Sequence, residues 1–96
     1  KFKTDDLLLA PLAKAAIGDA YVELGNYDKA ISAYNDALAV NNNDFTTPTI
    51  KLKLALVYEE KGNVEKALVI LNEAKSEFPN NSEITAIEKN IARLNQ

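Results

Sequence analysis

The sequence predicts an all-α fold in which two helical hairpins stack side by side and a C-terminal helix closes the stack. Three observations lead to this prediction: one pattern occurs twice along the chain, the apolar residues of each copy recur at helical spacing, and a Gly-Asn pair divides each copy in two. The 96 residues have room for one domain with a thin core, which we place at residues 1–96.

The repeat relates residues 16–31 to residues 53–68, with Gly25 and Gly62 standing 37 residues apart. Each glycine is expected to take the left-handed backbone conformation that ends a helix. The first hairpin, with an N-terminal extension, is predicted at residues 5–40 and the second at residues 48–81. A slightly lengthened connection around residues 44–48 joins them, and a closing helix is predicted at residues 82–96.

Each predicted helix carries an apolar stripe that faces its neighbour. The small residues Gly18, Ala30, Ala55 and Ala67 are expected where the two helices of a hairpin approach closely. Ser82 is expected to cap the closing helix, whose polar outer face predicts that it ends the domain. The stripes are Ile17, Tyr21 and Leu24, then Leu54, Val57 and Tyr58 in the first helices, Ala30, Ile31, Tyr34, Ala37 and Leu38, then Ala67, Leu68, Leu71 and Ala74 in the second helices, and Ile84, Ile87, Ile91 and Leu94 in the closing helix.

Composition excludes several classes of function. The net charge of −3 is spread over interspersed acidic and basic residues, so there is no basic stripe for nucleic acid. The absence of histidine and cysteine excludes catalytic triads that use either residue and most zinc sites. The longest apolar run, residues 7–13, contains Pro11 and is far shorter than the roughly 18 residues of a membrane span. We expect no cofactor and no metal.

Two acidic pairs are the nearest approach to a chemical site in the sequence. Asp5 and Asp6 follow Thr4, a pattern that favours the start of a helix over a metal site. Glu59 and Glu60 point about 100° apart on a helix and therefore do not face each other as an acid pair. The sequence predicts no catalytic residue and no enzyme.

The repeated segments resemble the tetratricopeptide repeat family, which has a large-small-tyrosine pattern in its first helix and alanine, aromatic and proline positions later. The chain departs from the family pattern at Lys14 and Lys51, where tryptophan is frequent, and at Asn42, where the second repeat has Pro79. The resemblance implies a right-handed α-solenoid that binds proteins on a concave face. The matching residues are Ile17, Gly18, Tyr21, Ala30, Tyr34 and Ala37, then Leu54, Ala55, Tyr58, Ala67, Leu71, Ala74 and Pro79.

In this family the first helices line the concave face, so their outward residues are the candidate binding residues. Leu52 and Leu56 form an apolar edge beyond the core stripe of their helix. This edge is either a groove for a partner or is covered internally by Leu8, Leu9 or Leu12. The candidate face consists of Leu12, Ala15, Asp19 and Val22 from the first repeat and Leu52, Lys53, Leu56 and Glu59 from the second, with Glu23, Thr49 and Glu60 beside them.

The ligand suggested by this face is an extended or helical peptide with small apolar side chains and one or two basic groups near Asp19 and Glu59. A carboxylate clamp of the kind known in the family is disfavoured, because Ala15 and Asp19 occupy the places of its lysine and asparagine and only Lys53 remains. The alternative function is self-assembly through an apolar edge at Leu7, Leu8 and Leu9.

The start at Lys1 without methionine predicts that these residues belong to a longer protein with earlier repeats. The Asn-rich turns and residues 17–21 are also similar to the periplasmic repeat domain of bacterial membrane-anchored proteins related to the ancillary subunit of the Sec translocon. This second resemblance implies a place on the periplasmic side of a bacterial membrane, with a cytoplasmic location as the alternative.

Overall fold

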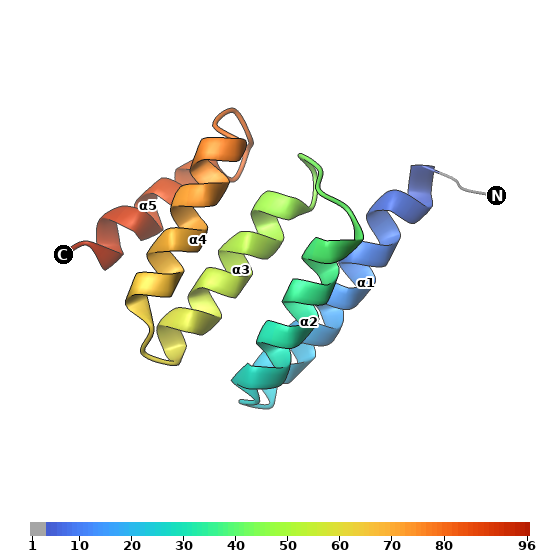
Figure 1. Ribbon diagram of the computed structural model, residues 1–96, viewed down its shortest axis with the longest axis horizontal. Helices are drawn as coiled ribbons and strands as arrows, with labels where there is room; N and C mark the ends of the chain where they lie inside the picture. Colours follow the sequence, from blue (N-terminus) through green and yellow to red (C-terminus); the bar gives the residue numbers. More distant parts are fainter. Residues whose placement is uncertain (1–3) are drawn as a thin grey trace.

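The computed structural model describes residues 4–96, with side chains from residue 9 onward. This part of the chain contains five helices and no strand, so the all-α prediction is confirmed. The helices lie in a row, each beside the next along the chain (Figure 1). They are α1 (Thr4–Glu23), α2 (Tyr27–Val40), α3 (Thr47–Glu60), α4 (Val64–Glu77) and α5 (Ile84–Leu94).

The Gly-Asn pairs form the turns inside the two hairpins, as predicted. Gly25 and Gly62 have φ angles of 75° and 88°, in the left-handed region that glycine adopts without a steric penalty. The asparagine after each glycine then caps the next helix: the side chains of Asn26 and Asn63 accept hydrogen bonds from the backbone N–H groups of Lys29 and Lys66, at 3.3 and 3.1 Å. The capping role of these asparagines was not predicted.

The core is a strip that runs along the row of helices, because the main contacts join α1 to α2, α2 to α3, α3 to α4 and α4 to α5. The molecule measures 48 × 33 × 16 Å and is therefore a thin slab. The buried side chains that form the main core cluster are Ala15, Ala30, Tyr34, Ala37, Ile50, Leu54, Ala55, Val57, Ala67, Ile70, Leu71, Ala74 and Ile87.

The close approach predicted at Gly18 is confirmed. The aromatic ring of Tyr34 in α2 lies directly against the backbone of α1 at this residue, and a Cβ atom there would be 2.6 Å from Cε1 of the ring. Ala30, Ala55 and Ala67 are completely buried. Small residues therefore set the spacing of the helices within both hairpins.

The core stripe predicted for the first helix is wrong at two positions. Ile17 and Leu24 are 53% and 78% exposed, whereas Pro11, Ala15 and Gly18 are buried. The physical reason is the place of α1 at the edge of the row (Figure 1): its buried face meets α2, and no described helix covers the side that carries Ile17.

The connections between repeats are held by asparagine side chains. Asn43 Oδ1 accepts hydrogen bonds from the backbone N–H groups of Phe45 and Thr46, both at 2.8 Å, which fixes the lengthened connection before α3. Before α5, Asn81 Oδ1 accepts from the N–H of Glu83 at 2.8 Å. Ser82 is not the cap, because Glu83 stands at that position and makes no side-chain capping bond.

None of the helices within residues 4–96 is both long enough and apolar enough to cross a membrane. The capping role predicted for Thr4, and the helix-start interpretation of Asp5 and Asp6, concern side chains outside the described part of the chain.

Candidate protein-binding site

Three side chains from three helices meet on the candidate face. Lys53 of α3 lies 2.8 and 3.0 Å from the two carboxylate oxygens of Asp19 in α1. The hydroxyl of Tyr34 in α2 donates to Asp19 Oδ1 at 2.5 Å. The carboxylate therefore links the first hairpin to the second and satisfies the polar atom of an otherwise buried tyrosine.

The neighbours of Asp19 and Tyr34 shift the pKa values of both side chains. Burial raises the pKa of Asp19, but the hydrogen bonds from Lys53 and Tyr34 outweigh this effect, so the pKa of Asp19 lies below its ordinary value. Burial and the neighbouring carboxylate both raise the pKa of Tyr34. Asp19 is thus charged at neutral pH and Tyr34 is a neutral donor, an arrangement that suits structure rather than proton transfer.

An apolar hollow of about 200 Å³ lies beside this cluster. Leu56 forms part of its wall and is 38% exposed, and Val22 of α1 and Val57 of α3 line the same space. Leu52, by contrast, is partly buried and packs against the core. The full lining is Val22, Tyr27, Tyr34, Lys53, Leu56, Val57 and Glu60.

The edge formed by Leu52 and Leu56 thus divides into two parts. Leu52 belongs largely to the core, while Leu56 faces the hollow and remains accessible. Leu9 and Leu12, two of the three residues considered as an internal cover for this edge, are 60% and 48% exposed.

At the end of α3 a second ion pair reaches the C-terminal helix. Arg93 of α5 donates from its two terminal nitrogens to the Glu59 carboxylate at 2.5 and 2.7 Å. The hydrogen bonds from Arg93 lower the pKa of Glu59. Arg93 was not predicted as a partner, because a contact between residues 34 positions apart depends on how α5 docks.

Most candidate residues are at least partly exposed on α1 and α3, but Leu52 packs largely against the core and Ala15 is buried. Ala15 is only 4% exposed and belongs to the core, because it lies on the face of α1 that packs against α2. A ligand cannot reach it, and the expectation for Ala15 is corrected. Of the residues proposed for self-association, Leu7 and Leu8 lie outside the described side chains, while Leu9 is exposed.

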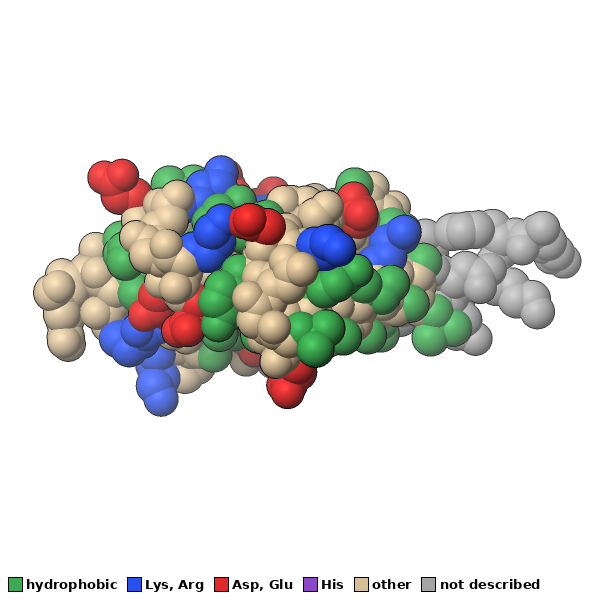
Figure 2. All heavy atoms as spheres, turned by 90° about the horizontal axis from the view of Figure 1, so that it is seen from below, with side chains coloured by type: hydrophobic (Ala, Val, Ile, Leu, Met, Phe, Trp, Pro, Cys, Tyr) green, Lys and Arg blue, Asp and Glu red, His purple; other side chains and the backbone are tan. Residues whose placement is uncertain are grey.

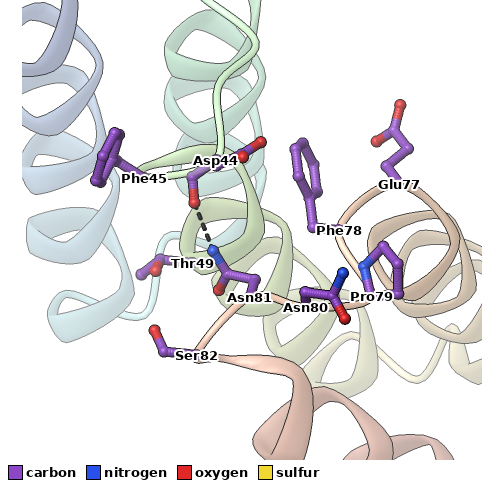
Figure 3. Close-up of a pocket in the computed structure, with 9 residues that line it drawn as sticks. All are labelled: Asp44, Phe45, Thr49, Glu77, Phe78, Pro79, Asn80, Asn81 and Ser82. Carbon is purple, nitrogen blue, oxygen red and sulfur yellow. Dashed lines mark hydrogen bonds between the residues drawn. The ribbon is translucent and has the colours of Figure 1, made fainter.

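A larger hollow of about 480 Å³ lies at the opposite ends of the helices, between the α2–α3 and α4–α5 connections (Figure 3). Asn81 Nδ2 donates to the carbonyl oxygen of Asp44 at 2.5 Å and joins the two connections. Phe45 is 78% exposed, and its ring points away from Phe78 (Figure 3). No residue of this hollow was predicted as part of a site, apart from Thr49.

No metal site is present among the described residues, since no three His, Cys, Asp or Glu side chains gather there in a suitable arrangement. The candidate face instead contains two ion pairs, Lys53–Asp19 and Arg93–Glu59, and the hydroxyl of Tyr34. An apolar hollow lies beside them. These groups can bind and orient another chain, and they lack an activated nucleophile.

A row of helical hairpins with Gly-Asn turns and a shared strip of core defines a helical repeat protein. The family model for the tetratricopeptide repeat matches residues 15–82, and the chain belongs to that family. Repeats of this family generally mediate protein–protein interaction and are typically non-catalytic scaffolds. None of the curated proteins matches the chain.

Proposed function

We propose that this chain is a non-catalytic scaffold that binds an extended peptide across α1 and α3, with a small apolar side chain seated in the hollow at Leu56. The observation that carries the proposal is the accessible apolar wall at Leu56 and Val22, in a protein whose family mediates protein–protein interaction. A concave hollow lined mainly by apolar side chains, with a few polar groups beside it, is the usual form of a contact for a ligand side chain.

Charge supports a particular peptide chemistry. Asp19 is neutralised by Lys53 and Glu59 by Arg93, so neither carboxylate is the best contact for a basic group. Glu60 lines the hollow and makes no ion pair among the described residues, and Glu23 of α1 is likewise exposed without one. We therefore place the basic group of the peptide beside Glu60, next to the apolar residue.

The test starts from a phage-displayed library of random peptides selected on the purified chain. Enriched peptides should combine a small apolar residue with a neighbouring lysine or arginine. Leu56→Asp should weaken their binding about tenfold or more, because the hollow would then hold an unpaired carboxylate. Glu60→Lys should shift the selected peptides from basic to acidic residues.

Val69→Asp is the matched control, because Val69 is 50% exposed on α4 and does not line the hollow. Its binding should equal that of the unmodified chain. Selected peptides that bind Leu56→Asp as tightly as the unmodified chain would contradict the proposed site.

The division into a first repeat at residues 5–40, a second at residues 48–81 and a cap at residues 82–96 remains our proposal for the limits of the units. The likeness to the periplasmic repeat domain also stays a prediction. Self-association, the alternative function, concerns a different face of α1.

A further inference from the structure

The side chain of Lys53 serves the apolar hollow in two ways. It lines the hollow, and its ammonium nitrogen lies 2.8 and 3.0 Å from the carboxylate oxygens of Asp19. The side chain therefore reaches from α3 to α1 and closes one end of the hollow. Glu60 lines the hollow two helical turns further along α3, about 10.5 Å along the helix axis, and Leu56 stands between the two ends.

Lys53 is also the direct link between α1 and α3 on this face. The main contacts of α1 are with α2, and those of α3 are with α2 and α4. Within residues 9–96, whose side chains are described, the pair of Lys53 and Asp19 is the only ion pair or side-chain hydrogen bond between α1 and α3. The length of the hollow between these helices therefore depends on the Lys53 side chain.

Two carboxylates lie close to the hollow, one near each end. Glu60 makes no ion pair among the described residues, whereas Asp19 is bound to Lys53. The side chains of Lys53 and Asp19 are 39% and 46% exposed, so a ligand can reach this pair. Lys53 already supplies the positive charge and the N–H donors that a basic residue of a peptide would offer to Asp19.

The wider charge distribution does not favour either end. Basic and acidic side chains lie next to each other on the face shown in Figure 2, and they do not form separate patches. Interspersed charges of this kind largely cancel beyond a Debye length, so no broad field orients a charged ligand. The pairing of each carboxylate with its own neighbour then determines which one receives a basic group.

We propose that Lys53 is the specificity-determining residue of the peptide site, because it occupies the position of a second basic group of the ligand. This inference rests on the proposed function and concerns the same hollow. The aliphatic part of Lys53 limits the bound apolar side chain to a small one. Its ammonium group holds Asp19, so the chain selects peptides with one basic group, which lies beside Glu60.

Two substitutions separate the aliphatic part of Lys53 from its charge. Lys53→Met keeps an unbranched side chain of nearly the same length and frees the Asp19 carboxylate. Lys53→Ala frees Asp19 and also opens the end of the hollow. Both variants should keep the helical circular dichroism of the unmodified chain, because Tyr34 still donates to Asp19 and an ion pair between half-exposed groups contributes little stability.

Peptides are selected from one phage-displayed library on the unmodified chain and on both variants. The unmodified chain should enrich peptides with one basic residue beside a small apolar one. Lys53→Met should enrich peptides with a second basic residue and an equally small apolar one. Lys53→Ala should also accept a larger apolar residue, such as leucine or phenylalanine.

A lysine scan of one peptide selected on the unmodified chain then measures the effect of the charge. At one or more positions, an added lysine should strengthen binding to Lys53→Met about tenfold, as expected for a hydrogen bond to a charged group, and should not strengthen binding to the unmodified chain. Adding Asp19→Asn to Lys53→Met should remove this gain. An effect of Lys53 on stability alone would not produce a gain that depends on the Asp19 carboxylate.

Lys51→Met is the matched control, because Lys51 lies on the same helix, pairs with Glu77 at 2.9 Å and does not line this hollow. It should select the same peptides as the unmodified chain. The inference is overturned when both Lys53 variants select those same peptides too, or when the gain from the added lysine survives Asp19→Asn.

Binding to Leu56→Asp, measured with the same peptides, distinguishes the two proposals. Weakened binding to Leu56→Asp together with unchanged selection by the Lys53 variants would keep the peptide site and reject the role of Lys53. Normal binding to Leu56→Asp would reject the site itself, and the role of Lys53 with it.

Discussion

The ring of Tyr34 occupies the space where a side chain on Gly18 would stand. A Cβ atom on Gly18 would lie 2.6 Å from Cε1 and 2.7 Å from Cδ1 of the ring. Tyr34 cannot move away freely, because it is 2% exposed and its hydroxyl is bound to Asp19. The absence of a side chain at Gly18 thus allows α1 and α2 to lie this close together at the Tyr34 ring.

Gly18→Ala should therefore destabilise the protein although alanine favours helix. The gain in helix propensity is about 1 kcal/mol, while forcing a buried ring and its helix apart typically costs about 1–3 kcal/mol, so we expect a net loss. Urea denaturation measures the change. Gly18→Ala should cost less stability in a chain that already carries Tyr34→Leu than in the unmodified chain, because the ring that the new Cβ atom would contact is then absent.

Ala16→Gly is the matched control on the exposed side of the same helix. It should destabilise by about 1 kcal/mol through propensity alone. A Gly18→Ala variant that is more stable than the unmodified chain would show that α1 and α2 separate without cost, contrary to this account.

The turn glycines should respond to substitution for a different reason. Gly62 has a φ angle of 88°, and a Cβ atom there would meet nothing within 4 Å. Gly62→Ala should cost roughly 1–2 kcal/mol from backbone strain alone. Gly62→Asn should cost less, because asparagine tolerates the left-handed region better than alanine. Equal losses in thermal or urea denaturation would argue against backbone strain as the cause.

The Asp19 cluster predicts a pH dependence of stability. The folded pKa of Asp19 is below its unfolded value, so its contribution is complete above the unfolded value, near 3.8, and is lost as the pH falls through the folded pKa. Asp19→Asn removes this contribution. Urea denaturation at pH 6 and pH 3 should therefore show a smaller acid-induced loss for the variant than for the unmodified chain, and an equal loss would contradict the prediction.

The turns and the helices of this fold were predictable because their signals are local. Gly25 and Gly62 end helices through their own backbone freedom, and the apolar spacing around Leu54 and Leu71 is contained within one helix. The asparagine caps were missed although their signal was present, since Asn26 and Asn63 each stand directly before a helix.

The sequence predictions were wrong where the buried face of a helix depends on which other helix lies beside it. Ile17 fits the same stripe as Leu54, yet only Leu54 has a helix on that side. Ala15 was placed on the wrong face because a helix that is apolar nearly all round gives no direction for its buried side. The pairing of Arg93 with Glu59 required the docking of α5, which a one-dimensional pattern does not define.

Because the core is thin, the loss of one buried side chain in the second hairpin should lower the free energy of unfolding strongly. Leu71 is completely buried, and Leu71→Ala should cost about 2–5 kcal/mol, a large share of the roughly 5–14 kcal/mol expected for a domain of this size. Val69→Ala, at a half-exposed position of the same helix, should change stability by no more than about 0.5 kcal/mol.

In a row of helices each unit is stabilised mainly by its neighbours, so local opening should increase first where Leu71 packs. Amide hydrogen exchange of Leu71→Ala should therefore accelerate most in α3, α4 and α5 and least in α1 and α2. Uniform acceleration in all five helices would mean that the slab unfolds as one cooperative unit despite its linear contacts, and the nearest-neighbour description of this protein would then be wrong.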